Sequence, residues 1–184
     1  PIPADHSQNL TGIWPKKVVN YKTVMSDAAS GFTSVTYPFP VIRMADLYLM
    51  YAEALNEKGE DYATVLPWID MVRERSGLQG VKESWDQYVG NSKYATQTGL
   101  RQIIMQERRI ELAFEGHYFW DVRRWKTATT ELTQPLTGWK VRYGETDVDY
   151  YSENLVLVRD FTPKMYFWPI DIGELRKDPN LVQN

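Results

Sequence analysis

Glu107 and Glu111 are the two residues whose type and spacing come closest to a catalytic arrangement in this sequence. Enzymes that cleave glycosidic bonds use two carboxyl groups, about 5–9 Å apart, on opposite sides of the bond. Two residues four positions apart on one helix lie on the same side of any cleft. The spacing therefore favours a structural role for both carboxylates, and we expect no catalytic residues and no enzyme activity.

The same two glutamates fall on an apolar helix face, so they need positively charged partners. Five apolar side chains share that face: Leu100, Ile103, Ile104, Ile110 and Phe114. An isolated buried charge is strongly destabilising unless it is paired. We therefore predict a buried or half-buried ion-pair network where the helices meet. Its predicted members are Glu107, Glu111, Arg43, Arg108, Arg123 and Arg124, with Arg73, Arg75 and Arg109 as further available cations.

Metal, thiol and phosphate chemistry find little support in the sequence. Its two histidines, His6 and His117, are far apart, and it has no cysteine. It carries no nucleophile elbow, no glycine-rich phosphate loop and no zinc-protease motif. We expect no cofactor and no metal. The net charge of −3 gives no basic footprint for nucleic acid.

Tryptophan and tyrosine are abundant outside the helical stripes, and they supply the candidate ligand-binding residues. Trp85, Tyr88, Trp139 and Tyr143 are the residues we select. Flat rings with polar edges can stack on sugar rings, but they equally suit protein interfaces and packing beneath loops.

The distribution of proline and glycine divides the chain into three stretches, which we interpret as one structural unit over residues 1–184. Residues 1–40 and 128–184 are rich in loops, whereas residues 41–127 are strongly helical. Short extended pieces are expected at 33–37, 155–158 and 165–168, where apolar or β-branched residues cluster.

Three helices are predicted in the central stretch. The first covers 41–58 and ends at Gly59, and the second ends at Ser76-Gly77, with its regular part beginning or kinking at Pro67. The third covers 100–115 with Thr98 as its N-cap. The first two should form an antiparallel hairpin that echoes the tetratricopeptide pattern.

The first helix has one broad apolar face, which we expect to include core residues. That face carries Met44, Leu47, Tyr48, Tyr51, Ala52 and Leu55, and we expect both tyrosines to pack in the core. Its alanines allow a neighbouring helix to approach closely.

Five segments, in order, resemble the SusD/RagB family. They are residues 43–57 (RMADLYLMYAEALNE), 72–78 (VRERSGL), 107–116 (ERRIELAFEG), 119–125 (FWDVRRW) and the C-terminal stretch 166–184 with YFWPI and NLVQN. The chain departs from the family pattern at Asp171, at Asp178-Pro179 and at Pro67, which affects local turns.

The resemblance implies a mainly α fold of tetratricopeptide-like hairpins with long irregular loops. It also implies the C-terminal part of a larger lipoprotein on the outer membrane surface, with the lipid anchor before Pro1. Such a protein binds an oligosaccharide or other nutrient and delivers it to a SusC-like TonB-dependent transporter. The family's signature residues in this segment imply architecture and mark no sugar contact.

Two alternatives remain open at the level of sequence. A tetratricopeptide adaptor would bind peptide tails, and a glycoside hydrolase would depend on Glu107. A precursor that carries a lipobox cysteine would favour the surface protein over the adaptor.

Overall fold

The computed structural model describes residues 9, 11–13, 15–25, 31–140 and 145–183. The chain forms two compact units, which we call the helical unit (Lys17–Tyr118) and the terminal unit (Pro1–Lys16 with Phe119–Asn184). These boundaries differ from the composition changes near residues 40 and 127. The description of residues 1–184 as one structural unit stays a prediction.

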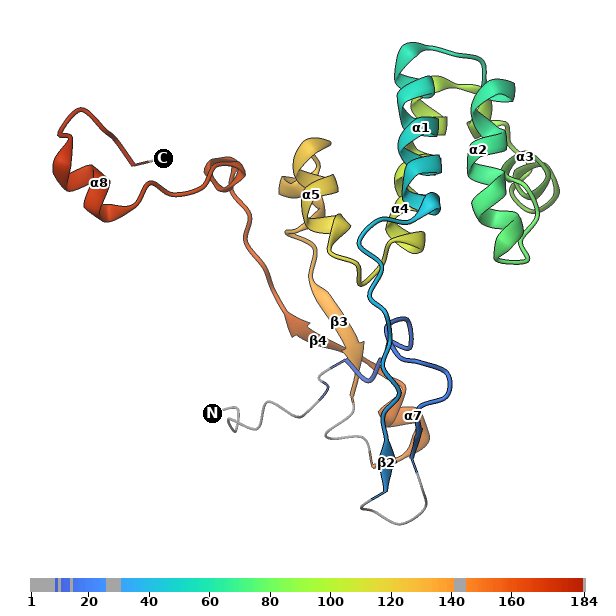
Figure 1. Cartoon of the computed structure of the whole chain (residues 1–184), viewed down its shortest axis with the longest axis horizontal. Helices are drawn as coiled ribbons and strands as arrows, with labels where there is room; N and C mark the ends of the chain where they lie inside the picture. The colour runs from blue at the N-terminus through green and yellow to red at the C-terminus, as the bar shows by residue number, and fades with distance from the viewer. Residues whose placement is uncertain (1–8, 10, 14, 26–30, 141–144, 184) are drawn as a thin grey trace. The chain divides into compact units, whose positions relative to one another are not determined.

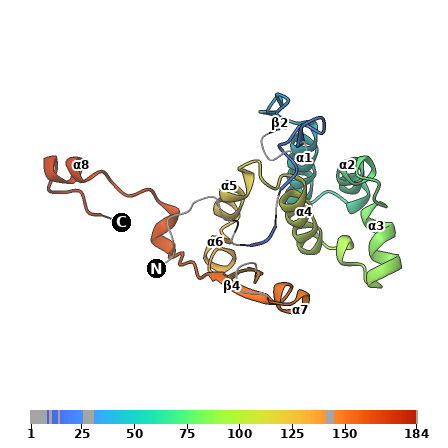
Figure 2. The same cartoon turned by 90° about the horizontal axis from the view of Figure 1, so that it is seen from below.

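The helical unit is built on three helices, α1 (Met44–Lys58), α2 (Tyr62–Arg75) and α4 (Gln97–Glu111). The first two form an antiparallel hairpin, and α4 packs against both (Figure 1). Figure 2 shows the same three helices from below. The hairpin turns at Gly59, whose φ of 88° lies in the left-handed region that glycine adopts without strain. The mainly α fold with a tetratricopeptide-like hairpin is thereby confirmed.

A single apolar core fills the space between these helices. Its fully buried side chains include Leu49 of α1, Ile69 of α2, and Leu100 and Ile104 of α4. In α1 the buried face carries Ala45, Leu49 and Ala52. The expectation for α1 was wrong in part, because Met44, Leu47 and Tyr51 are exposed and Tyr48 is half-buried. Side-chain contacts of α1 with α4 come from Asp46 and Asn56 on the same side of the helix.

The second helix begins earlier than predicted. Asp61 caps it by accepting a hydrogen bond from the backbone N–H of Ala63 at 2.7 Å. This cap satisfies a free N–H group of the first turn. The helix therefore begins at Tyr62 and includes Pro67 in its interior, and it ends before Ser76 as expected.

The helix α4 also begins and ends earlier than predicted. Its N-cap is Thr96, whose hydroxyl accepts from the N–H of Gly99 at 3.1 Å, and not Thr98. It ends at Glu111, because the following turn contains Phe114 with a φ of 64°. Phe114 and Ile110 are exposed and do not extend the buried face.

Shorter elements complete the helical unit. They are β1 (Val24–Met25), β2 (Phe32–Thr33), α3 (Val81–Ser84), the π-helical turn η1 (Trp85–Val89) and the 3-10 turn η2 (Lys93–Ala95). The two strands pair antiparallel. The turn η2 leads directly into the N-cap of α4.

The terminal unit has mostly short elements. They are most of α5 (His117–Arg124), α6 (Ala128–Glu131), β3 (Leu136–Trp139), α7 (Asp147–Tyr150), β4 (Glu153–Leu157), η3 (Pro163–Tyr166) and α8 (Ile172–Lys177). Strands β3 and β4 pair antiparallel, so that Trp139 lies opposite Glu153. The expected extended segment at 165–168 begins instead in the 3-10 turn η3, where Pro163 fits the first position of a helical turn. No helix in the described part of the chain is long and apolar enough to cross a membrane.

Candidate functional site

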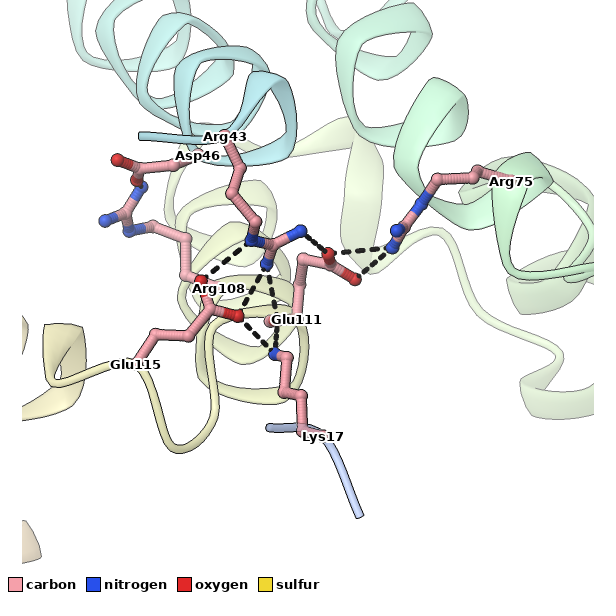
Figure 3. Close-up of polar contacts among 7 residues, drawn as sticks. All are labelled: Lys17, Arg43, Asp46, Arg75, Arg108, Glu111 and Glu115. Carbon is pink, nitrogen blue, oxygen red and sulfur yellow. Dashed lines mark hydrogen bonds and ion pairs between the residues drawn. The ribbon is translucent and has the colours of Figure 1, made fainter. Parts of the chain in front are cut away.

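Glu111 is the centre of an ion-pair cluster in the helical unit. Its carboxylate accepts hydrogen bonds from Arg43 Nη1 and Arg75 Nη2, each at 2.7 Å (Figure 3). Its backbone oxygen accepts a further hydrogen bond from Arg43 Nη2 at 2.9 Å. The Glu111 side chain is 12% exposed. Three elements therefore meet at one carboxylate: α2, α4 and the residue that precedes α1.

Glu115, just beyond α4, extends this cluster. Arg43 donates to both of its carboxylate oxygens at 2.7 and 2.8 Å, and Lys17 Nζ lies 2.5 Å from it. Figure 3 shows the carboxylate between these two cations. Burial pushes the pKa of Glu115 upward, but the hydrogen bonds from Arg43 and Lys17 outweigh burial and hold that pKa below its ordinary value. Burial likewise opposes ionisation of Arg43, yet its two glutamate partners raise its pKa.

Two further ion pairs lie in the same unit. Arg73 pairs with Glu107 and donates to the carbonyl of Gln79 at 2.8 Å. Arg108, with a side chain only 3% exposed, contacts Asp46 at 2.9 Å. Each of these carboxylates faces a guanidinium group. Such pairing between helices suits a scaffold.

Two of the arginines that the sequence analysis grouped in one network have partners of their own in the other unit. Arg123 and Arg124 belong to the terminal unit. There, Arg123 donates to the carbonyl of Met165 at 2.6 Å with its guanidinium 4.2 Å from the Phe119 ring centre, and Arg124 contacts Asp121 at 2.8 Å.

Sequence reasoning missed two members of the cluster, Lys17 and Glu115, and Asp46 in the neighbouring pair with Arg108. Glu115 follows Glu111 by four residues, and that spacing was a usable signal. Lys17 lies in the loop-rich lead-in, where no periodicity predicts a partner.

Trp139, at the end of β3, lies in an open cleft of the terminal unit. The cleft has a volume of about 240 Å³ and is lined by Ile13, Thr137, Gly138, Trp139 and Glu153. Trp139 is 39% exposed, and its ring meets Tyr151 edge to face with centres 5.8 Å apart. A partly exposed ring that is supported from one side can stack on a flat ligand. The neighbouring carboxylate can then accept hydrogen bonds from the hydroxyl groups of that ligand.

Backbone contacts hold the strand that lines this cleft. Thr11 O accepts the N–H of Trp139 at 3.0 Å, and Asn9 Oδ1 accepts from Thr11 N at 2.9 Å. A Cβ at Gly138 would lie 2.6 Å from Thr11 Cα, so only glycine permits this close approach. The strand that carries Trp139 is thus tied to a segment far away in the sequence.

The other predicted aromatic residues lie elsewhere. Trp85 is half-buried against the core of the helical unit, with Lys93 Nζ 5.4 Å from its ring centre. Tyr88 is 72% exposed in η1. Tyr143 lies outside the described residues. Of the three that the structure describes, Trp139 lines the cleft introduced above. Across the described residues, no three potential ligands among His, Asp and Glu come together as a metal site.

Similarity to known proteins covers most of the chain. SusD-like protein P25 of Formosa agariphila is 39% identical over 144 residues, which are 78% of this chain and 23% of that protein. A SusD-like protein of Bacteroides fragilis has a solved structure that is 30% identical, with a TM-score of 0.63 over 82% of this chain and 28% of that one. The solved structure of BT4246 is 27% identical, with a TM-score of 0.67 over 83% of this chain and 24% of that one.

This chain thus spans about a quarter of the length of these relatives. The sequence profile of the SusD family matches residues 1–184, which is the entire chain. The chain therefore belongs to the SusD family.

Proposed function

We propose that this chain is part of a cell-surface nutrient-binding protein that captures an oligosaccharide without cleaving it. The protein delivers the ligand to a SusC-like TonB-dependent transporter in the outer membrane, and a lipid anchor outside this chain holds it at the surface. Family membership supports this proposal. The observation that carries it is the open cleft with the half-exposed Trp139.

The cleft offers the two contacts that a sugar needs. The Trp139 ring can cover the apolar face of a pyranose, and the carboxylate of Glu153 and the hydroxyl of Thr137 can exchange hydrogen bonds with its hydroxyl groups. Because backbone contacts already hold the strand of Trp139 in place, binding requires little ordering of the protein.

The carboxylates that could suggest hydrolysis are committed to cations. Glu107 pairs with Arg73, and Glu111 lies between Arg43 and Arg75. A catalytic carboxyl needs access to the scissile bond, and both carboxylates are instead occupied by arginines. We therefore assign binding without turnover.

Affinity electrophoresis of the intact protein against a panel of polysaccharides tests the proposal. We expect at least one polysaccharide to retard the protein, and Trp139→Ala to remove most of that retardation. Trp168→Ala is the matched control, because this tryptophan is also exposed but is absent from the cleft lining. Trp85→Ala and Tyr88→Ala, in the same assay, test the two remaining predicted residues.

Two results would contradict the proposal. One is the release of shorter sugars from a retained polysaccharide, since this shows turnover. The other is full retention by Trp139→Ala, since this removes the cleft from the binding surface. Co-purification of the intact protein with a TonB-dependent transporter from outer membranes tests the delivery step.

A further inference from the structure

The helical unit has a second hollow, at the end of the α1–α2 hairpin, which we call the hairpin-end cavity. The turn at Gly59 and the segment from Tyr94 to Gln97 border it. Its volume is about 340 Å³, at the lower end of the range typical of small-molecule sites. Such a volume suits one small ring rather than a long chain.

Reciprocal amide contacts make the walls of this cavity rigid. Asn56 Nδ2 donates to the backbone oxygen of Gln97 at 3.1 Å, and Gln97 Nε2 donates to the backbone oxygen of Asn56 at 2.7 Å. Tyr94 is buried, with its hydroxyl 2.8 Å from Asp86 Oδ1, and its ring meets the Tyr62 ring edge to face with centres 5.4 Å apart. The last turn of α1 and the start of α4 are therefore held together around a preformed space.

Two polar groups at this cavity have unused hydrogen-bonding capacity. Asn56 is 1% exposed, yet its Oδ1 accepts no hydrogen bond from any residue that the structure describes. The half-buried hydroxyl of Tyr62 also has no hydrogen-bond partner within the described part of the chain. Both groups line the cavity and can exchange hydrogen bonds with a polar occupant of it.

The charge of the lining residues favours a neutral ligand over an anionic one. Glu60 and Asp61 contribute carboxylates, and none of the described lining residues is Lys, Arg or His. Asp61 uses one oxygen as the cap of α2, and Glu60 pairs with Lys58 at 2.6 Å. An anionic ligand would be repelled by these carboxylates, because no cation in the lining offsets them. The hydroxyl groups of a neutral ligand could instead donate hydrogen bonds to the carboxylates and to the tyrosine hydroxyl.

We propose that the hairpin-end cavity binds one neutral pyranose unit, either a free monosaccharide or the end of an oligosaccharide. This inference rests on the proposed function for the ligand class, but it names a second site in the helical unit that is built from other residues than the Trp139 cleft. Its test can therefore fail while the cleft still binds.

Calorimetric titration of the intact protein with glucose, galactose, mannose and xylose, and with a methyl glycoside and a disaccharide of each, tests the site. We expect at least one of these sugars to bind, and Ala95→Trp to abolish that binding because it fills the cavity from an exposed wall position. Tyr62→Phe removes only the hydroxyl and should weaken binding about 3- to 10-fold. Ala54→Trp, at an exposed position of α1 outside the lining, should bind like the original protein.

The forms of each sugar separate the two ligand sources. Binding of the free sugar but not of its methyl glycoside or disaccharide would identify a monosaccharide site. Binding of all three forms would identify a site for the end of a chain.

Thermal unfolding of each variant separates lost binding from lost folding, and Tyr62→Phe keeps the test valid if Ala95→Trp unfolds. The site is overturned if no sugar of the panel binds, which would leave water only in the cavity. It is equally overturned if the same sugar binds Ala95→Trp and Tyr62→Phe with unchanged affinity. Polysaccharide retention that depends on Trp139 would survive either result, and the proposed function would then stand without this second site.

Discussion

The ion-pair cluster around Glu111 and the cleft around Trp139 use polar and aromatic side chains in opposite ways. In the cluster, carboxylates and guanidinium groups are largely removed from water and contact one another. In the cleft, an aromatic ring is left partly exposed beside a carboxylate. Groups that satisfy one another stabilise the fold, whereas groups left open to solvent remain available to a ligand.

This difference separates scaffold from recognition surface within one chain. Removing one partner of a buried ion pair leaves a charge that is neither hydrated nor paired, and this is strongly destabilising. Removing a half-exposed ring deletes contacts but leaves no such charge. Mutations in the cluster should therefore lower stability, whereas mutations in the cleft should lower ligand binding.

The largest expected effect follows from Glu111→Ala. The substitution leaves Arg43, which is mostly buried, without one of its two carboxylate partners, while the exposed Arg75 can return to water. We expect the free energy of unfolding of the intact protein to fall by about 3–5 kcal/mol, measured by urea denaturation.

Glu174→Ala is the matched control for that substitution. Glu174 pairs with Lys177 in α8, and both side chains are largely exposed, so its loss should cost below about 1 kcal/mol. Similar small losses for both variants would contradict the distinction between scaffold and surface.

Much of the helical scaffold could be predicted from sequence because its signals are local. Gly59 ends α1 through a backbone conformation that few other residues adopt, and Ser76-Gly77 ends α2 as the pattern indicates. Thr96 and Thr98 have equal capping chemistry, so the choice of Thr96 depends on how η2 enters α4. Periodicity alone placed larger residues of α1 in the core, whereas the buried apolar face consists of Ala45, Leu49 and Ala52.

The sites were less predictable because they depend on contacts between distant segments. Charge balance indicated that Glu107 and Glu111 need arginines, but only the path of α2 brings Arg73 and Arg75 to them. Trp139 has no local signal that separates it from Trp85. Its strand is held by Thr11, a residue in the N-terminal lead-in that lies far away in the sequence. The role of both tryptophans in binding stays a prediction.

Trp139→Ala should show the reverse profile of Glu111→Ala. Its retention on the polysaccharide that binds the original protein should fall at least about tenfold, equal to ~1.4 kcal/mol. Its unfolding free energy should fall by only about 1–2 kcal/mol, since the ring is already partly exposed. Affinity electrophoresis and urea denaturation of the same preparation provide both values. A stability loss as large as that of Glu111→Ala would assign Trp139 to the scaffold.

Acid should weaken the cluster through Glu115. Arg43 and Lys17 hold the pKa of Glu115 below its unfolded value of 4.5. This carboxylate therefore contributes stability that is fully present above pH 4.5 and is lost as the pH falls through the lower folded pKa. Urea midpoints measured from pH 7 to pH 3 should fall less steeply for Glu115→Gln than for the original protein. Parallel pH profiles would show that Glu115 gains nothing from its cationic neighbours.

The smallest effect is expected at Asp70, a carboxylate of the helical unit whose pKa shifts in the opposite direction. Burial raises the pKa of Asp70, and the Val81 N–H at 2.7 Å and the charge of Arg73 only partly oppose it. The stability that Asp70 contributes is therefore complete below its unfolded pKa of 3.8 and is lost as the pH rises through the folded value. Asp70→Asn retains an oxygen that can accept the Val81 N–H and removes the charge, so at pH 7 its urea midpoint should equal or slightly exceed that of the original protein. A urea midpoint of Asp70→Asn below that of the original protein at pH 7 would contradict this prediction. It would mean that the Asp70 charge stabilises the fold, as the paired charge of Glu111 does.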